Sequence, residues 1–323
     1  MIYFAGIDGG GTKTHCMICD ENGIIVGEGK AGASNYQIVG SEICGSELEK
    51  AFSAALSSAS LPSEKVSYVF MGLSGADEPY DIKELNKICS KIFGKIAFKV
   101  VNDVWICLRS ALRQSWGAVS ICGTGFNAGA RNIGGKEIIL RAEGYELGNL
   151  GGGDHLSRIA LHHAFQADEG TGPDTLLQTE IPKALNFFDM GSLFSAFRKS
   201  EELLEKSLDK IPPLVFKLAS QRDKVCQKIL LNLGNSMGQE ICGVIIRSGM
   251  EDSKFPLVLG GSIYNDISCP LLIDSLITRV HQTAQNAYIV FPQRPPVTGA
   301  LICALQAAGI TLNDTIYNNV GII

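Results

Sequence analysis

Short apolar runs alternate with longer stretches of helical periodicity along most of the chain. Apolar runs of about four to eight residues bounded by turn residues predict strands, and apolar positions spaced three and four apart predict amphipathic helices. The predicted strands are 66–73, 97–101, 117–122, 128–132, 137–141, 256–259 and 288–291. The predicted helices are 41–59, 81–93, 103–112, 154–166, several between 182 and 248 with 223–247 the longest, 271–284 and 296–308. This alternation predicts a largely parallel sheet with helical cover.

The N-terminal stretch has a different pattern. The apolar run Phe4–Ile7 leads to Asp8 and then to Gly9-Gly10-Gly11-Thr12-Lys13-Thr14. The residues that follow predict a strand, a turn at 20–23, a second strand at 24–26 and a loop over 27–35. The glycine turn therefore joins two antiparallel strands and does not open a helix.

This context decides which phosphate-binding device the glycine turn can be. A P-loop needs Gly-Lys-Ser/Thr at the start of a helix, whereas here Thr12 separates Gly11 from Lys13 and a strand follows. Backbone N–H groups without a neighbouring Cβ can still approach phosphate oxygens, and Thr12, Thr14 and Lys13 add hydroxyls and a positive charge. Asp8 can hold Mg²⁺ through water. The alternative is an ordinary hairpin turn, which seldom needs three glycines beside Asp and Lys.

Similar glycine turns follow two later strands. Gly123-Thr124-Gly125 comes after strand 117–122 and before a return strand, and Gly260-Gly261-Ser262 comes after strand 256–259. Asp103 closes the strand that lies between the first two turns. The two halves share no repeated sequence, but the repeated order of strand, glycine tip and return strand indicates a repeated organisation.

Length and charge narrow the class of protein. The 323 residues suit about two domains of usual size, and 46% of them are hydrophobic, which allows sizeable cores. The formal net charge of −5 argues against broad nucleic-acid binding. No apolar run is expected to span a bilayer, and the start of the chain lacks the basic region and cleavage site of a signal peptide. We therefore expect no nucleic-acid or membrane partner.

The ten cysteines indicate buried, reduced thiols in the cytosol. Cys16 and Cys19 have the spacing of a metal-binding pair, but no second such pair accompanies them. They lie in a predicted strand, where an odd separation sends two side chains to opposite faces. We therefore predict that both pack in the core.

The order of these features resembles that of the actin/hexokinase/Hsp70-type nucleotide-binding superfamily. More narrowly, the chain resembles N-acetylglucosamine kinase-like members of the BadF/BadG/BcrA/BcrD ATPase family. The motifs are clear up to residue 167 and again over 257–309, whereas 168–254 is matched only by its helical content. The resemblance implies an α/β fold of two actin-like (ribonuclease H-like) lobes, with mixed sheets, helical cover and Mg-ATP in the cleft. The expected lobes are 1–113, with the helix near 297–309 as a candidate addition, and 114–323.

The resemblance also implies roles for the motifs. Residues 6–14 and 123–127 are the expected phosphate hairpins, and 260–262 are expected to lie against the adenosine. Alone, Gly260-Gly261 would be read as a simple strand-to-helix turn. In similar sugar kinases the aspartate that matches Asp103 accepts the proton of the attacking hydroxyl. The N-terminus of a helix favours the ionised form of such a residue. The alternative is that Asn102 or Asp103 only caps the helix.

Sugar contacts follow from the same resemblance. Asn35, Ser74, Gly75 and Thr124 match segments that contact the sugar in the family, and Asp103 is expected beside them. Such polar groups suit recognition of hydroxyls and amides, because an unmatched substrate leaves them unpaired. Each of these residues on its own is also a common turn residue.

The stretch 144–157 departs from the family pattern. The family shows Gly-Asp-Glu-Gly-Ser after a Gly-Trp-Gly turn. In this chain Asp154 and Ser157 align with the Asp and the Ser of that motif. His155 and Leu156 stand where the motif has Glu and Gly, and the Trp of the turn is missing. A wider pocket that also takes N-acetylmuramic acid follows as a hypothesis, with His155 facing the lactyl carboxylate. His155 can equally be an ordinary residue in the first turn of a helix.

The sequence hypothesis is an ATP- and Mg²⁺-dependent amino-sugar kinase acting on O6 of N-acetylglucosamine or a close relative. The resemblance suggests a homodimer, and the protein is expected to be cytoplasmic. One rival is an ATPase activator of a 2-hydroxyacyl-CoA dehydratase or benzoyl-CoA reductase. Such activators tend to carry a Gly-Gly-Gln-Asp motif and cysteines that share an iron–sulfur cluster. A second rival is a non-catalytic sensor of the same fold.

Overall fold

A computed structural model describes residues 2–266 and 268–322, and these residues form two five-stranded sheets. The strand orders are β3-β2-β1-β4-β5 and β10-β9-β6-β7-β8. In each sheet a β-hairpin, β1–β2 or β6–β7, continues antiparallel into a third strand. Two further strands add parallel to the other edge of β1 or β6. The predicted repetition of organisation is therefore present in the fold.

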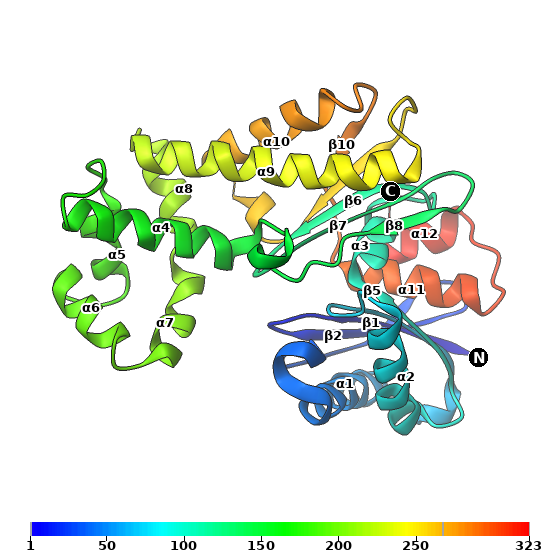
Figure 1. The fold of residues 1–323 in the computed structure, drawn as a ribbon. Helices are drawn as coiled ribbons and strands as arrows, with labels where there is room; N and C mark the ends of the chain where they lie inside the picture. The colour runs from blue at the N-terminus through cyan, green and yellow to red at the C-terminus, as the bar shows by residue number, and fades with distance from the viewer. Residues whose placement is uncertain (1, 267, 323) are drawn as a thin grey trace.

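The first sheet is built by the N-terminal third of the chain. Its strands are β1 (Tyr3–Gly9), β2 (Thr14–Asp20), β3 (Ile25–Ala31), β4 (Val66–Leu73) and β5 (Ala97–Asn102). One face carries α1 (Tyr36–Ala59) and α2 (Pro79–Phe93). The other face carries α3 (Asp103–Ala111) together with two helices from the end of the chain, α11 (Pro296–Ala307) and α12 (Asp314–Val320) (Figure 1).

The second sheet has a larger helical cover. Its strands are β6 (Gly117–Cys122), β7 (Phe126–Arg131), β8 (Glu137–Ile139), β9 (Pro256–Gly260) and β10 (Tyr288–Val290). The main cluster of buried residues includes α4 (Gly152–Asp168), α9 (Lys224–Ser248) and α10 (Leu271–His281). Four short helices extend away from the sheet, at the left of Figure 1: α5 (Leu177–Ala184), α6 (Met190–Phe197), α7 (Glu201–Ser207) and α8 (Pro212–Ser220).

Helix α3 lies between the two sheets. Ile106 packs in the core of the first sheet, whereas Val104, Cys107 and Leu108 pack with Val119 and Val258 of the second. Because α3 begins at the carboxyl end of β5, its first residue is held at the junction of the two halves. That residue is Asp103.

The prediction of a loop over 27–35 is wrong for its first half, which forms most of β3. A Cβ on Gly27 would lie 2.4 Å from the Ala55 carbonyl oxygen, and one on Gly29 would lie 2.2 Å from the Ala51 carbonyl oxygen. The glycines therefore serve close packing of the strand against α1 and do not mark a turn. Helix α12 was not predicted.

Helix α9 bears on the expectation that no apolar run could span a bilayer. By length and composition it could cross a membrane, although the sequence analysis expected no such run. However, 56% of its apolar window is buried inside the protein. Its apolar face packs on α10, where a Cβ on Gly234 would lie 2.1 Å from the Leu272 carbonyl oxygen. This is the pattern of a core helix.

The predicted packing of the paired cysteines in β2 is confirmed. Cys16 belongs to the core under α1 and α2, and Cys19 belongs to the core on the opposite face of the sheet. Both side chains are fully buried. The spacing of the two cysteines is therefore explained by the two-sided burial of β2.

The contact between α3 and α11 is a test of how this arrangement is stabilised. A Cβ on Gly299 would lie 2.0 Å from the Ile106 carbonyl oxygen, so the helices would have to separate. We expect Gly299→Ala to lower the free energy of unfolding by about 1–3 kcal/mol, as overpacking does. The matched control is Gly243→Ala in α9, where a Cβ meets nothing within 4 Å. It should raise stability by up to about 1 kcal/mol. Urea unfolding checks both, and equal effects would contradict the packing role.

Candidate active site

The first glycine turn is held by the two segments that were predicted to contact a sugar. Backbone N–H groups of Ser34 and Asn35 donate to the Gly10 carbonyl at 3.0 and 3.2 Å, and the Ser74 N–H donates to the Gly9 carbonyl at 2.8 Å. The turn and both segments therefore form one unit at the carboxyl end of β1 and β4. This edge of a parallel pair is where ligands bind in many α/β proteins.

The predicted sugar contacts of this lobe lie together. The Asn35 side-chain amide donates to the Ser74 hydroxyl at 3.2 Å, and its oxygen accepts from the Gln37 N–H at 3.0 Å, which caps α1. Gly75 has a φ of +81°, and a Cβ there would lie 2.6 Å from that Asn35 oxygen. Asn35 is 8% exposed, so its first role in the fold is to join the two segments.

The hydroxyls of the turn have different surroundings. Thr14 is fully buried, and its hydroxyl donates to the Gly32 carbonyl at 2.7 Å and lies 2.8 Å from the Ser34 hydroxyl. It supports the turn from inside. Thr12 is exposed, and its hydroxyl lies 3.4 Å from that of Thr124 in the second turn. The two predicted phosphate turns therefore face each other.

Open space surrounds the glycines of the second turn. A Cβ on Gly123 or Gly125 would meet nothing within 4 Å. Behind the turn, the Gly153 N–H donates to the Gly123 carbonyl at 2.8 Å and the Asp154 N–H donates to the Thr124 carbonyl at 3.0 Å. Because internal packing does not require glycine at these two positions, close approach of a ligand is the better reason for it.

A cavity of 260 Å³ adjoins the second turn. Its lining combines the turn with α8 and the segment after β9: Gly123, Thr124, Gly153, Asp209, Pro212, Pro213, Phe216, Ser262, Ile263 and Asp266. Of the third predicted motif, Ser262 lines the cavity. Gly260 and Gly261 are explained by packing, since Cβ atoms there would lie 2.4 Å from the Cys107 sulfur and 2.3 Å from the Cys122 carbonyl oxygen.

The residues that α8 and the preceding turn contribute to the cavity were not predicted. They come from 168–254, where the sequence showed helical spacing without a motif. The only local signal is the pair Pro212-Pro213, which begins α8. Prolines at a helix start do not reveal what the helix faces.

Carboxylates gather beneath the turns. Asp8, the predicted Mg²⁺ residue, lies near the end of β1, and Asp103 begins α3; both are partly buried. Burial raises the pKa of Asp8 to about 6, although Lys13 opposes the shift. Burial, with the charges of Asp8 and Asp77, raises the pKa of Asp103 to about 8. The charges of Asp8 and Asp77 therefore both act on Asp103.

Asp77 is the member of this group that the sequence analysis missed. Its Oδ1 atom accepts from the Asn102 side-chain amide at 2.8 Å and from the Asn127 side-chain amide at 3.0 Å. Burial and the charges of Asp81 and Glu143 raise its pKa to about 7. It follows Ser74-Gly75 in the chain, but no sequence pattern shows that it faces two asparagines from different strands.

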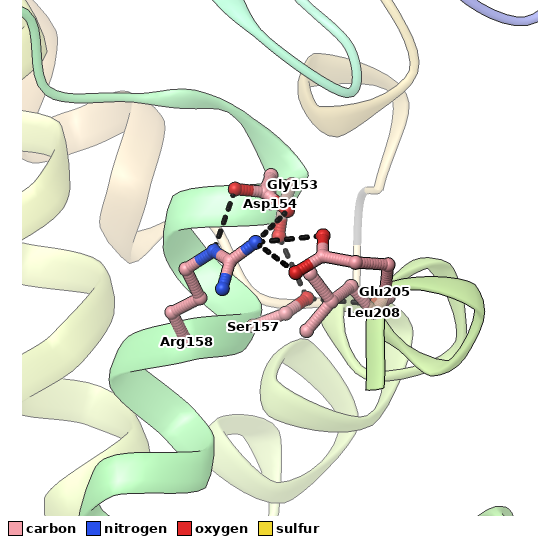
Figure 2. A network of polar contacts seen from close by, with 6 residues as sticks. All are labelled: Gly153, Asp154, Ser157, Arg158, Glu205 and Leu208. Atoms are coloured by element: carbon pink, nitrogen blue, oxygen red, sulfur yellow. Dashed lines mark hydrogen bonds and ion pairs between the residues drawn. The ribbon is translucent and has the colours of Figure 1, made fainter. Parts of the chain in front are cut away.

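Asp154 and Ser157, aligned above with the family motif, have partners inside the protein. Figure 2 shows Asp154 paired with Arg158 at 2.9 Å, while Arg158 also pairs with Glu205 at 2.7 Å. The Ser157 hydroxyl is buried and lies 2.7 Å from the carbonyls of both Gly153 and Leu208. These contacts tie α4 to α7 and the turn after it.

His155 lines a second cavity, of 430 Å³, between α4 and α9. Its ring stacks on Tyr145 with a centroid distance of 6.1 Å, and burial lowers its pKa despite the charge of Asp154. The residues of this cavity and those of the 260 Å³ cavity do not overlap. The sugar contact of His155 therefore stays a prediction, and the contact that the structure gives its ring is Tyr145.

The fold and this site define a class: an actin-like, two-lobed protein whose two glycine hairpins approach each other from the two sheets. The chain belongs to the BadF/BadG/BcrA/BcrD ATPase family, whose model matches residues 5–304. The expected fold is confirmed by a candidate N-acetylglucosamine kinase from Chromobacterium violaceum, with a TM-score of 0.73 and 20% identity, covering 95% of this chain and 99% of that one.

Curated relatives match over nearly the whole chain. The N-acetyl-D-glucosamine kinase of Dictyostelium discoideum is 27% identical over 94% of this chain and 98% of its own length. The N-acetylmuramic acid/N-acetylglucosamine kinase of Clostridium acetobutylicum is 25% identical over the same shares of the two chains.

The raised pKa of Asp103 makes a prediction about stability. In the folded state this carboxyl holds its proton to higher pH than it does in the unfolded chain, so folding stability falls as pH rises from about 4 to about 8. Asparagine cannot ionise. We expect Asp103→Asn to raise the melting temperature at pH 8 without Mg²⁺ by at least about 2–4 °C, the effect of roughly 1 kcal/mol. The gain should shrink towards pH 5.

Asp223 provides a control of opposite sign. Burial raises its pKa, but hydrogen bonds from the N–H groups of Cys226 and Leu176 outweigh burial, and the net shift is downward. Its ionised form therefore stabilises the fold above the unfolded pKa, and Asp223→Asn should lower the melting temperature at pH 8. Both are measured by scanning fluorimetry between pH 5 and 8. A lower melting temperature for Asp103→Asn at pH 8 would contradict the electrostatic account.

Proposed function

We propose that the protein is an ATP-dependent amino-sugar kinase that phosphorylates the O6 hydroxyl of N-acetylglucosamine, of N-acetylmuramic acid, or of both. The observation that carries the proposal is the position of Asp103, partly buried below two glycine turns that approach each other from the two sheets. The names of the curated relatives support the amino-sugar class. Turnover of a panel of sugars and NMR of the product test which sugar is the substrate and which hydroxyl is phosphorylated.

The cap of α3 favours a chemical role for Asp103. The Asn102 side-chain oxygen accepts from the Val104 N–H at 3.0 Å and so caps the helix. The capping role considered for Asp103 is therefore already filled by its neighbour. A carboxylate at the first position of a helix, held between two sheets, is rigidly placed to accept the proton of a sugar hydroxyl as that hydroxyl attacks the terminal phosphate of ATP.

The two turns are proposed to hold the phosphates. The Gly10 and Gly123 N–H groups already donate within the turns, to the Lys13 and Gly125 carbonyls. The proposed donors are therefore the N–H groups of the residues that follow them in each turn, and Lys13 provides a charge. The 260 Å³ cavity beside Ser262 is proposed to take the adenosine. Asn35, Ser74 and Gly75 are proposed to position the sugar. Closure of the lobes around both substrates would exclude water and limit hydrolysis of ATP.

The residues present fit a magnesium ion. Asp8 is a partly buried carboxylate beneath the first turn, and its pKa of about 6 indicates that its negative charge lacks sufficient compensation. Among residues 2–266 and 268–322, no group of three or more acidic, histidine or cysteine side chains is placed to hold a metal ion by itself. Asp8 would therefore hold Mg²⁺ together with water and phosphate oxygens. The ion would neutralise charge on the phosphates.

The surroundings of the cysteines favour the kinase over the dehydratase or reductase activator. An activator would need cysteines at the surface to share an iron–sulfur cluster with a partner. Nine of the ten cysteines are buried, and Cys303 is partly buried. We also infer that the protein is cytoplasmic and that it forms a homodimer. Light scattering of the purified protein will test the homodimer.

The function is tested by ATP turnover coupled to ADP detection. The panel contains N-acetylglucosamine, N-acetylmuramic acid, glucosamine, glucose and no sugar. We expect sugar-dependent ADP release with one of the N-acetylated sugars, and a fall of about 10²–10⁴-fold in kcat for Asp103→Asn, the usual effect of losing a general base. Proton–phosphorus coupling in the NMR spectrum of the product identifies the phosphorylated hydroxyl.

Three outcomes would redirect the proposal. ATP hydrolysis independent of sugar, with an iron–sulfur absorption band, would support the activator. Sugar binding without turnover would support the sensor. Turnover with product phosphate on another hydroxyl would correct the assignment of O6 alone.

A further inference from the structure

Asp77 occupies a position where three parts of the candidate site meet. It lies between the Ser74-Gly75 segment after β4 and the start of α2 at Pro79. Its Oδ1 atom accepts one hydrogen bond from Asn102, at the end of β5 in the first sheet, and one from Asn127, in β7 of the second sheet. A single carboxylate oxygen therefore joins the two halves of the protein.

The bond to Asn102 connects Asp77 to the start of α3. Asn102 is 4% exposed, and its side-chain amide is engaged at both ends. Its nitrogen donates to Asp77, and its oxygen accepts from the Val104 N–H. Because Asp103 is the next residue, the orientation of the Asn102 amide affects where the proposed base lies.

The bond to Asn127 connects Asp77 to the second glycine turn. Asn127 follows Gly125 by two residues, and its oxygen accepts from the Ala128 N–H at 2.7 Å. Its amide is thus also engaged at both ends. A movement of the second lobe would carry Asn127 with it and stretch the hydrogen bond to Asp77.

Two other polar contacts between the two halves are more exposed. Thr12 and Thr124 are exposed hydroxyls 3.4 Å apart. Arg141 and Glu78 pair at 3.2 Å, with side chains that are 84% and 48% exposed. Exposed ion pairs contribute little to stability, whereas a hydrogen bond to a shielded carboxylate contributes more. The contact between Asp77 and Asn127 is therefore the stronger candidate for holding the lobes together.

Asp77 lies in an environment of like charges. Asp81, Glu143 and Glu78 each raise its pKa, in addition to burial, and Asp77 in turn raises the pKa of Asp103. A carboxylate placed among other carboxylates is unfavourable unless donors compensate it. The two asparagine amides provide that compensation.

We propose that Asp77 is a positioning residue that couples closure of the two lobes to the placement of Asp103, through its hydrogen bonds to Asn127 and Asn102. The kinetic part of this inference rests on the proposed function. The part that concerns the contact between the lobes does not, because it can be measured on the protein without a substrate.

The test is a reciprocal exchange of the two side chains. Asn127→Asp places a carboxylate against Asp77, and we expect it to lower kcat at least tenfold and to raise the KM for the sugar. Adding Asp77→Asn to that variant removes one of the two facing negative charges and again places one amide opposite one carboxylate. The double variant should recover most of the lost kcat. A side chain with a merely local structural role would not show this rescue.

Two further variants complete the experiment. Arg141→Ala is the matched control, since it removes the exposed ion pair with Glu78, which also joins the two halves. It should leave kcat and KM within about twofold. Asp77→Ala removes both hydrogen bonds and should lower kcat as Asn127→Asp does. Melting temperatures of all variants, measured without substrate, show whether the two positions are coupled in the folded state.

The outcomes separate this inference from the proposed function. An active wild-type enzyme with no rescue in the double variant, or with unchanged kcat in Asn127→Asp, would overturn the role of Asp77 and leave the kinase intact. If every variant and the wild type lack activity on all sugars, the proposed function fails. Melting temperatures that show no coupling would then also reject the contact between the lobes.

Discussion

The close packing of α11 against β1 and α3 is the constraint on which the rest of the structure depends. A Cβ on Gly6 of β1 would lie 2.6 Å from the Leu301 N–H nitrogen, and one on Gly299 would lie even closer to the α3 backbone. These two glycines let a helix from the end of the chain contact the central strand and the central helix. Since β1 carries Asp8 and α3 begins with Asp103, this packing sets the relative positions of the two carboxylates.

The site places carboxyl groups where their ionised form is unfavourable. Several carboxyl groups with raised pKa values lie beneath two turns whose glycines allow the backbone to be approached. Negative charge that is buried in this way is unfavourable, and a bound cation would reduce the cost. Carboxyl groups with raised pKa values that lie close together are typical of functional sites. Asp77 adds a mechanical link, because its partners come from both lobes.

Two groups of glycines in the chain have different physical causes. Gly27, Gly29 and Gly299 are required by close packing between elements. Gly123 and Gly125 have open space around them, so the better explanation is room for a ligand. In the sequence these groups look alike, which is why 27–35 was predicted as a loop although β3 occupies its first half.

The sequence alone predicted most of the strands and helices and the hairpin nature of the first glycine turn. These follow from local patterns, since periodicity and turn residues act over a few positions. The packing of the elements decides that Asp77 joins Asn102 to Asn127, that Asp154 is paired with Arg158, and which side chains line the 260 Å³ cavity. Those contacts join residues from separate elements. Such contacts arise from how sheets and helices pack, and no local pattern encodes them.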